Sequence, residues 1–433
     1  MARIKLVYIG GGSTRAPGTV ASLIVRGAVF SGSEIVLVDL DPDHLVVVER
    51  LARRMAVARD LDLRITATTD RLDGLRDADI VLASFRPGGF EARILDEQIP
   101  LLHGIVGQET QGPGGFFMAL RSIAVVRDIM ADIERVAPRA TLINYTNPVN
   151  IVSEAITHHS PIRTISLCEG PITFPADIAR FAGLDPARLD ATLVGLNHTG
   201  WTVRQEYDGE DVIDRIRAVA DERTTRPSGD PVADRLLRLA ATMGSLPSGY
   251  LDYYYFAPET LVEARAKPTT RAQDIVALVP DYWRHYEEQS RADDPTLDPA
   301  RSRGGIHELE LAIDVIDALV NDRGTVWPVN VPNVGGALPG FPDDLVVEVP
   351  AVVGRAGVVP IAQPPLPATV RGLIEALGAY QALTAEAAWS GSRRDAVAAL
   401  TSHPLVGSLT LAETLYDDMA NAHRAHLPER LLR

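Results

Sequence analysis

The sequence predicts an α/β protein in which a doubly wound parallel sheet is followed by a mixed α+β part. Short runs of branched apolar residues, the pattern of buried strands, alternate with helical segments through residues 1–195. A glycine-rich turn stands between the first strand and the first helix. The patterns become irregular further on, so we expect a first domain over residues 1–195 and a second over residues 196–433.

Composition narrows the range of partners. The 433-residue chain carries a formal net charge of −15, which argues against nucleic acid or an anionic membrane, because both favour basic surfaces. A small anionic substrate needs only a local basic pocket. A single cysteine permits no intramolecular disulfide and fits a reducing cytoplasm. We find neither a signal peptide nor an apolar run of membrane-spanning length.

The first turn is Gly10-Gly11-Gly12-Ser13, between a buried strand (4–9) and a helix (19–26). In that context glycines let the backbone approach a pyrophosphate at a helix N-terminus. The match to G-x-G-x-x-G is partial, because Arg15 stands where the third glycine would fall. The turn therefore predicts a Rossmann-type dinucleotide site, with a plain tight turn as the alternative.

Asp39 ends the second predicted strand, residues 34–39. A carboxylate at this point can hydrogen-bond the adenosine ribose, and it would repel a 2′-phosphate, so NAD is favoured over NADP. The alternative is a cap for the following helix (45–58), a role that Asp41 or Asp43 would serve equally well.

Two further strands, 63–68 and 80–84, continue the alternation, so ligands are expected beyond the carboxyl ends of the strands. Residues 84–89 leave the fourth strand at that edge, and Arg93 follows shortly after. The Arg93 guanidinium suits a phosphate or a carboxylate. An ordinary surface arginine is the alternative.

The glycine-dense stretch 107–115 predicts an irregular loop, because so many glycines disfavour the interior of a helix or strand. Such loops are often functional. A helix (117–136) and a strand (141–144) follow, and Asn147 then precedes Pro148. Proline keeps Asn147 extended and opens the next helix, so the Asn147 amide either binds a ligand or caps that helix.

Cys168 follows a strand over residues 164–167 and reaches the same edge of the sheet. A later strand, 191–196, presents Asn197 and His198. A soft thiolate and an imidazole suit a divalent transition metal. A small buried apolar side chain, the usual role of a free cysteine, is the alternative.

The second part of the chain offers fewer candidates for functional residues. Four tyrosines in 250–255 are typical of a core or of a wall that faces a sugar, and Arg271 is a second basic candidate. We expect ordinary packing or surface roles for His307, His403 and His423. Residues 226–230 predict a turn between helices. The remaining predicted elements are helices at 176–182, 308–320, 370–389 and 411–426 and strands at 326–331 and 345–353.

Taken together, these stretches resemble glycoside hydrolase family 4, the NAD- and metal-dependent glycosidases. The resemblance covers nearly the whole chain, and its most specific motifs are VGQETQGPGG (106–115), TNPVN (146–150) and GLNH (195–198). Within the family, the chain is most similar to 6-phospho-β-glucosidases. The implied architecture is like that of lactate and malate dehydrogenases. Other matching segments lie at 10–13, 86–93, 167–168, 250–255 and 329–333.

The resemblance implies redox-assisted elimination in place of the two-carboxylate scheme of most glycosidases. NAD takes a hydride from C3 of the sugar, and the resulting ketone acidifies the proton on C2. A base removes that proton, the aglycone leaves C1, water adds, and the hydride returns. A divalent metal, expected to be Mn(II), binds the C2 and C3 oxygens and stabilises the enediolate.

The resemblance also implies residue roles. Cys168 and His198 match the metal ligands, Tyr250 matches the tyrosine base, and Glu109 lies in the QET loop near the metal as a second catalytic candidate. The expected contacts to NAD come from Gly10, Gly11, Gly12, Ser13, Asp39 and Asn147. The expected contacts to the substrate come from Arg93, Asn147, Glu169 and Arg271.

Three residues depart from the family pattern. Glu169 stands where related enzymes carry asparagine or aspartate, and its anionic side chain would narrow the pocket or repel an anionic sugar. Asp252 adds a negative charge near any 6-phosphate, whereas Arg15 replaces an uncharged residue and would compensate. We therefore expect a 6-phospho-β-glucoside as substrate, with an unphosphorylated or uronic acid glycoside as the alternative.

Two other classes of protein compete with this interpretation. An NAD-dependent 2-hydroxy acid dehydrogenase shares the glycine turn but needs no metal, so the pair Cys168 and His198 argues against it. A nucleotide-sensing binding protein would tolerate Cys168→Ser and Tyr250→Phe. The VNVPN segment (329–333) and the apolar second part favour a homodimer or homotetramer.

Overall fold

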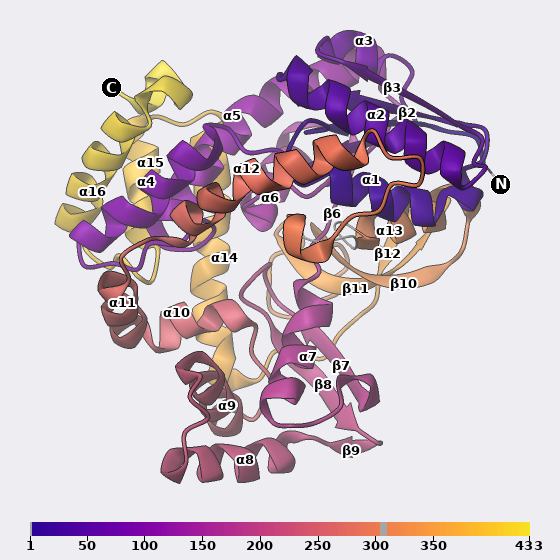
Figure 1. The fold of residues 1–433 in the computed structure, drawn as a ribbon. Helices are drawn as coiled ribbons and strands as arrows, with labels where there is room; N and C mark the ends of the chain where they lie inside the picture. Colours follow the sequence, from indigo (N-terminus) through magenta and orange to yellow (C-terminus); the bar gives the residue numbers. More distant parts are fainter. Residues whose placement is uncertain (1, 304–309) are drawn as a thin grey trace.

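The computed structural model describes residues 2–303 and 310–433. In these ranges the strands form a nine-stranded sheet in the order β12-β11-β10-β6-β5-β4-β1-β2-β3 and a three-stranded sheet in the order β7-β8-β9. Figure 1 shows the large sheet among helices and the small sheet in a separate projection below it. The small sheet therefore stands apart from the dinucleotide-type core.

The parallel part of the large sheet is doubly wound, as predicted. Its strands pair in the order β3-β2-β1-β4-β5-β6, so the chain reverses direction across the sheet between β1 and β4. The strands are β1 (Lys5–Ile9), β2 (Ser33–Val38), β3 (Leu63–Thr68), β4 (Ile80–Ala83), β5 (Thr141–Asn144) and β6 (Arg163–Ser166). The helices between them are α1 (Ala16–Val25), α2 (Pro42–Ala58), α3 (Arg71–Leu75), α4 (Gly89–Leu102), α5 (Gly112–Val136) and α6 (Val149–His159).

The second half of the chain returns to the same sheet. Strands β10 (Thr325–Pro332), β11 (Val346–Gly354) and β12 (Gly357–Pro360) are antiparallel and extend it beyond β6. Asn330 of β10 pairs with Ser166 of β6, which joins the two halves. β11 is buried on both faces along much of its length, because α13 (Glu310–Asn321) and α6 contact it.

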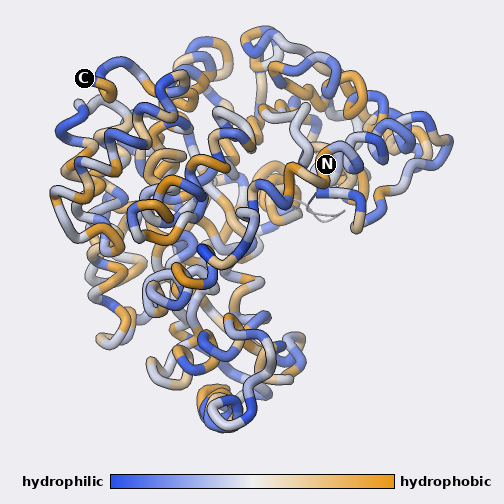
Figure 2. The backbone as a smooth tube through the Cα atoms, turned by 60° about the vertical axis from the view of Figure 1, so that its left-hand side comes forward, coloured by the Kyte–Doolittle hydropathy of each residue, from blue (hydrophilic) through white to orange (hydrophobic). Residues whose placement is uncertain are grey.

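A smaller lobe follows β6. Helix α7 (Gly170–Phe181), the strands β7 (Leu189–Val194), β8 (Trp201–Tyr207) and β9 (Glu210–Asp211), and the helices α8 (Ile213–Thr225) and α9 (Pro231–Met243) build it. It has an apolar core of its own, which includes Ile178, Tyr207, Ile216 and Leu237. Figure 2 shows this lobe projecting from the body of the molecule.

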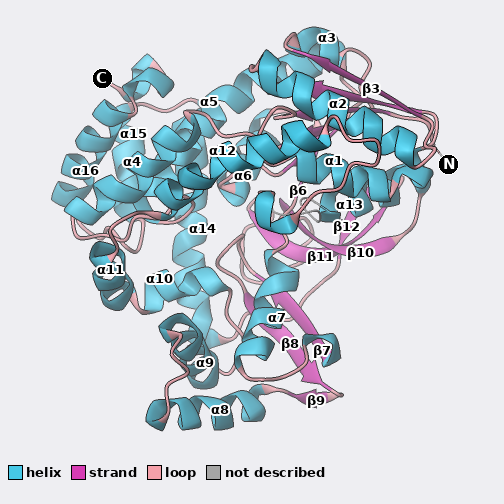
Figure 3. Ribbon diagram, in the orientation of Figure 1, coloured by secondary structure: helices cyan, strands magenta, loops and turns pink. Residues whose placement is uncertain are grey.

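The remaining helices form a mostly helical region next to the parallel sheet, on the left in Figure 3. Helix α14 (Ala368–Trp389) packs against α5, α6 and α15 (Arg393–Ser402), and α16 (Leu409–Ala422) packs against α4 and α15. Helices α10 (Asp252–Tyr255), α11 (Ala257–Ala266) and α12 (Arg271–Gln289) connect the lobe to α2 and α4. No helix in the described ranges is long and apolar enough to span a bilayer.

The predicted strands are confirmed to within a residue or two, and the turn at 226–230 does separate α8 from α9. The prediction for the glycine-dense stretch was wrong in part, because α5 begins at Gly112 and includes Gly114 and Gly115. A Cβ on Gly114 would lie 2.3 Å from the Gln108 carbonyl oxygen, so glycine is needed for close packing within the first turn.

Other elements were not predicted. Helix α4 was not predicted because its start, Gly88-Gly89, is typical of a turn, and α10 to α12 and α15 were not predicted either. The predicted helix 308–320 corresponds to α13, which begins at Glu310. His307 lies outside the described residues. His403 and His423 are both 1% exposed, so they are packing residues.

Candidate functional site

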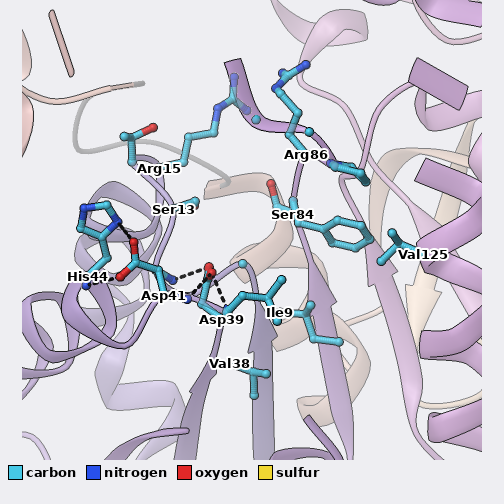
Figure 4. Close-up of a pocket in the computed structure, with 18 of the residues that line it drawn as sticks. Ile9, Ser13, Arg15, Val38, Asp39, Asp41, His44, Ser84, Arg86 and Val125 are labelled. Atoms are coloured by element: carbon cyan, nitrogen blue, oxygen red, sulfur yellow. Dashed lines mark hydrogen bonds and ion pairs between the residues drawn. The ribbon is translucent and has the colours of Figure 1, made fainter. Parts of the chain in front are cut away.

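A cavity of about 550 Å³ lies at the carboxyl ends of β1, β2 and β4, where the strand order reverses. This is the place where doubly wound sheets bind their ligands. The lining includes the glycine turn, Asp39, Asp41, His44, residues 84–90, Tyr145, Asn147, Trp283 and Arg303. Figure 4 shows Asp39, Asp41 and His44 on one side of this cavity and Arg15 and Arg86 both extending toward another.

The glycine turn lies against the sheet more closely than a simple tight turn requires. Gly10 has φ +101°, and a Cβ there would lie 2.1 Å from the carbonyl oxygen of Ser84 at the end of β4. The Gly10 and Gly11 N–H groups both donate to the Val38 carbonyl, at 2.9 and 3.1 Å. The absence of side chains therefore lets the backbone of the turn lie close to the end of β4 at the cavity wall.

The helix-cap alternative for Asp39 does not hold, because Asp41 is the cap of α2 and accepts hydrogen bonds from the N–H groups of Asp43 and His44. The Asp39 carboxylate accepts instead from Gly12 N–H at 2.8 Å and from Leu40 N–H at 2.7 Å. It lines the cavity directly beside the glycine turn.

An aromatic pair lines the same side of the cavity. The His44 ring stacks on Trp283 with centroids 3.6 Å apart and planes 2° apart. The Asp41 carboxylate lies 2.9 Å from His44 Nδ1 and holds the ring in place. A flat apolar surface next to Asp39 suits an adenine ring. It could not be predicted from the sequence, because Trp283 comes from the distant helix α12.

Three buried polar atoms of the cavity lining have no hydrogen-bond partner among the described residues: Ser13 Oγ, Asn147 Oδ1 and Arg303 Nη1. Such atoms cost free energy unless a ligand or water satisfies them. Asn147 does not cap α6, since its Oδ1 accepts no hydrogen bond from the first turn of that helix. The glycine turn, the carboxylate and these atoms together fit a dinucleotide.

Cys168 and His198 lie together, as predicted. The Cys168 Sγ is 3.6 Å from His198 Nε2. A divalent ion with bonds of about 2.3 Å to sulfur and about 2.1 Å to nitrogen fits between atoms at that separation. Cys168 Sγ also accepts from Gly170 N–H at 3.4 Å, and His198 has φ +68°, an uncommon conformation for a residue other than glycine.

A hydrogen-bond chain orients the His198 ring. Thr110 Oγ1 donates to Gln108 Oε1 at 2.9 Å and therefore accepts from His198 Nδ1, 3.0 Å away. Nε2 is then the unprotonated nitrogen, and it faces the Cys168 sulfur. Burial lowers the pKa of His198 to about 4, so the ring is neutral at pH 7 and its Nε2 lone pair is available to a metal.

Burial, reinforced by the carboxylates of Glu348 and Glu169, raises the pKa of the Cys168 thiol to about 12. A metal would displace that proton, because the thiolate is the ligand form. The described residues contain no group of three or more His, Cys, Asp or Glu side chains arranged around one metal position. The pair therefore leaves room for oxygen ligands from a substrate, and its donor set fits a transition metal.

Tyr250 lies on a short 3-10 helix (Gly249–Leu251) and covers the His198 ring. The two rings are stacked with centroids 4.0 Å apart, and Phe174 meets the Tyr250 ring edge-on at 5.7 Å. Burial and the nearby Glu109 carboxylate raise the pKa of Tyr250 well above its ordinary value. A phenol in this setting needs a nearby cation before it can act as a base.

Glu109 forms ion pairs with Arg86 and Arg93, at 2.6 and 3.0 Å. Burial alone would raise the pKa of Glu109, but Arg86, Arg93, Arg15 and Arg303 together lower it to about 2. Arg93 also binds the Glu97 carboxylate at 2.7 Å and is 5% exposed, so it is not an ordinary surface arginine. These four arginines form a cationic wall around Glu109, and three of them, Arg15, Arg86 and Arg303, also line the cavity.

Two contacts join this cluster to the cavity. Arg86 lines the cavity and binds Glu109, and Tyr145 lines it and donates to Glu169 at 3.0 Å. Arg271, by contrast, is exposed at the start of α12 and does not line the cavity. Asp252 accepts hydrogen bonds from Nε and Nη2 of Arg235, at 2.7 and 2.8 Å, and Glu263 binds the same guanidinium.

Several residues of the site were not found from the sequence. Thr110 orients His198, and Glu348 and Asn330 lie in a buried network that reaches Asn197. Glu348 did carry a signal, since a lone glutamate interrupts the apolar run Val346-Val347-Glu348-Val349. A charged residue inside a buried strand rarely occurs without a partner.

Comparison with known proteins identifies the family of the chain. The model of family 4 glycosyl hydrolases matches residues 5–184, and the model of the family 4 glycosyl hydrolase C-terminal domain matches residues 193–406. A probable 6-phospho-beta-glucosidase of Bacillus subtilis is 36% identical over 98% of both chains. A 6-phospho-alpha-glucosidase of Leptotrichia buccalis is 30% identical over 99% of both.

Solved structures agree with these matches. A 6-phospho-beta glucosidase of Thermotoga maritima, solved with manganese, NAD+ and glucose-6-phosphate, has a TM-score of 0.83 at 26% identity, over 98% of this chain and 99% of that one. Malate dehydrogenase of Plasmodium falciparum, at 10% identity and a TM-score of 0.54 over 89% of this chain and 100% of that one, shares the fold alone. The predicted architecture is thus confirmed, and the dehydrogenase alternative is not favoured. The chain belongs to the family 4 glycosyl hydrolases.

Proposed function

We propose that this protein hydrolyses the O-glycosidic bond of 6-phospho-β-glucosides with the help of NAD and a divalent metal, Mn(II). The observation that carries this proposal is that three features occur together in one site. They are a dinucleotide-type cavity, a cationic wall, and a Cys168–His198 pair covered by Tyr250. The similar Thermotoga maritima enzyme, solved with manganese, NAD+ and glucose-6-phosphate, supports each of the three ligands.

NAD would lie in the cavity at the end of the parallel strands. Gly10, Gly11, Gly12 and Ser13 would hold its pyrophosphate, and Asp39 would accept hydrogen bonds from the adenosine ribose. The unpartnered Oδ1 of Asn147 would bind either the dinucleotide or a sugar hydroxyl, since the residue lines the cavity. In this division, residues 1–195 bind NAD, and residues 196–433 complete the substrate site and the oligomer.

Cys168 and His198 would hold the metal. When bound, NAD exchanges hydride with C3 of the sugar, and the metal polarises the oxygens on C2 and C3. The residues of the chain have separate tasks. Thr110 keeps His198 in the tautomer that leaves Nε2 free, and Tyr250, stacked on that ring, would take the proton from C2 as the general base.

The cationic wall would bind the substrate and its phosphate. Glu109 holds Arg86 and Arg93 in position and stays ionised at neutral pH, so we assign it an electrostatic role next to the reacting sugar. Arg93, with Glu169 and Asn147, would contact the glycoside, and a guanidinium is well suited to a phosphate. The ion pair with Arg235 reduces the negative charge that Asp252 would present to an anionic sugar. Arg271 would reach a substrate only from the surface.

A hydrolysis panel tests the substrate. Aryl glucosides with and without a 6-phosphate, in both anomers, and aryl glucuronides are incubated with NAD, Mn(II) and a reductant. We expect turnover of the 6-phospho-β-glucoside with no net formation of NADH. Turnover of a glucuronide but of no phosphorylated glucoside would instead show that the site, with Glu169, accepts uronic acid glycosides. Net formation of NADH would point to a dehydrogenase.

We propose a cytoplasmic homodimer or homotetramer. The phosphorylated substrate supports the cytoplasmic location, because phosphate monoesters of sugars do not cross a bilayer unaided. Light scattering coupled to size exclusion, in the presence and absence of NAD, measures the mass of the assembly. A monomer at all concentrations would contradict the proposal for the oligomer and leave the proposal for the reaction in place.

A further inference from the structure

Glu348 lies in the middle of strand β11 and is 1% exposed. Its neighbours in the strand, Val347 and Val349, are fully buried. The backbone of Glu348 forms two hydrogen bonds with Gly195, which donates at 3.1 Å and accepts at 2.8 Å. Glu348 therefore lies directly beside the segment 195–198, which ends at His198.

The Glu348 side chain points to the same segment. Its Oε1 accepts hydrogen bonds from the amide nitrogens of Asn197 and Asn330, each at 2.9 Å. The Asn197 side chain also acts on Cys168, because its amide lowers the pKa of the thiol. Glu348, Asn197 and Cys168 thus form a chain of contacts that ends at one of the two proposed metal ligands.

Burying this carboxylate is costly. Burial raises the pKa of Glu348 to about 7, even though the Asn197 and Asn330 amides lower it. Its Oε2 and the Oδ1 atoms of both asparagines have no partner among the described residues. A hydrophobic residue of similar size would avoid this cost, so the position calls for a reason other than stability.

We propose that Glu348 is a positioning residue for the metal site, which aims the Asn197 amide at the Cys168 sulfur and holds the backbone that carries His198. Outer partners that orient ligands in this way are a general feature of metal sites. The inference rests on the proposed function, because it requires that Cys168 and His198 bind a metal. It adds a residue whose effect reaches the metal only through Asn197.

A second buried carboxylate that binds the same strand provides a matched control. Glu154 of α6 is also 1% exposed, and its Oε2 accepts from Val346 N–H at 2.7 Å and from Gln381 Nε2 at 2.8 Å. Glu154 therefore anchors β11 two residues away from Glu348, but its hydrogen bonds lead away from Asn197. The Glu154→Leu variant therefore measures what a buried carboxylate contributes to the stability of β11 without a link to Asn197.

The experiment measures metal binding with the full-length protein. The variants are Glu348→Leu, Glu348→Gln, Asn197→Leu, the double variant Glu348→Leu/Asn197→Leu, and the control Glu154→Leu. Mn(II) affinity is obtained from the electron paramagnetic resonance signal of the free ion. The near-ultraviolet charge-transfer band of bound Co(II) reports the bond to the Cys168 sulfur. Circular dichroism checks the fold of each variant.

We expect Glu348→Leu and Asn197→Leu each to weaken Mn(II) binding by about ten- to a hundredfold and to alter the Co(II)–sulfur band. The double variant should be no weaker than either single variant, because both act through one contact. Glu348→Gln keeps an oxygen that accepts from Asn197 and should restore most of the affinity. Glu154→Leu should lower thermal stability and leave the Co(II)–sulfur band unchanged.

Other results would overturn the inference. Unchanged Mn(II) affinity in Asn197→Leu would do so even if Glu348→Leu failed to fold. Losses of Mn(II) affinity that multiply in the double variant would also overturn it. So would a loss of Mn(II) affinity in Glu154→Leu equal to that in Glu348→Leu. Failure of the proposed function looks different. In that case the unmodified protein would bind neither ion, or Cys168→Ser would leave the Co(II) band in place.

Discussion

The imidazole of His198 and the phenol of Tyr250 lie face to face, with ring centroids 4.0 Å apart and ring planes 13° apart. The proposed metal ligand and the proposed base are therefore in direct contact. Burial raises the pKa of Tyr250, so the free protein holds an inactive phenol. A cation bound to His198 would act on that phenol at short range and favour the phenolate. Metal binding and activation of the base are thus linked in one structure.

Replacing Cys168 by serine tests the metal site. The serine hydroxyl is a harder and much less acidic ligand than a thiol, so Cys168→Ser should weaken Mn(II) binding by at least about a hundredfold and remove most of the activity. Titration with Mn(II) and hydrolysis assays at increasing Mn(II) measure both effects. Full activity of Cys168→Ser after the metal has been removed by a chelator would refute the metal assignment.

Tyr250→Phe tests the base. Phenylalanine keeps the ring that stacks on His198 and removes only the hydroxyl, so the fold and the Mn(II) affinity should persist. The rate should fall by about a hundredfold to ten-thousandfold, the range of general base catalysis. Exchange of the C2 proton with deuterated solvent, followed by nuclear magnetic resonance, isolates the step. Undiminished exchange would show that another group removes the proton.

Asp39→Ser tests the choice of cofactor. The serine hydroxyl can still accept a hydrogen bond but carries no charge to repel a 2′-phosphate, so the preference for NAD over NADP should fall roughly tenfold or more. Calorimetric titration gives the two affinities. Asp41→Ser is the control, because it also lines the cavity and serine still caps α2. An equal change in both variants would mean that general charge, and not the position of Asp39, sets the preference.

His403 predicts a pH dependence of stability. Burial lowers its pKa to about 3, and its Nδ1 accepts from Leu405 N–H at 3.1 Å. The pKa of this histidine is lower in the folded state than its unfolded value of about 6.5. Its contribution to stability is therefore fully present above pH 6.5 and is lost as the pH falls toward the folded pKa. The free energy of unfolding should therefore decrease by about 4 kcal/mol between pH 6.5 and pH 3 from this residue alone.

Urea unfolding of the metal-free protein across that pH range measures the effect. In the variant His403→Asn, the amide oxygen replaces Nδ1 as the acceptor and does not titrate, so the pH dependence should be shallower by the same amount. Parallel curves for the two proteins would show that His403 remains unprotonated, or that its pocket opens to water, throughout the transition.

The sequence was most informative where a residue has a local cause. Strands β1 to β6 are short apolar runs that end in turns, and Gly10 and Asp39 stand at fixed points of one strand–turn–helix unit. The proximity of Cys168 and His198 could also be predicted, because both follow strands and match one family motif each.

What the sequence did not reveal depends on contacts between distant segments. Trp283 reaches His44 only because α12 packs on α2, and Glu348 reaches Asn197 only because β11 lies beside segment 195–198. The start of α5 was misjudged for a similar reason, because the glycines at its first turn serve close packing against residues 96 and 108. Arg271 was selected by its charge, which does not indicate whether a side chain faces a cavity.

The pairing of β10 with β6 places strands from both sides of residue 195 in one sheet. A fragment that stops there would leave β6 as an unpaired edge in a sheet of apolar strands, an arrangement that promotes aggregation. About three quarters of the 433-residue polypeptide must also be synthesised before β6 acquires its second neighbour, since β10 begins at Thr325. Late closure between residues so far apart in the chain is expected to make folding slow.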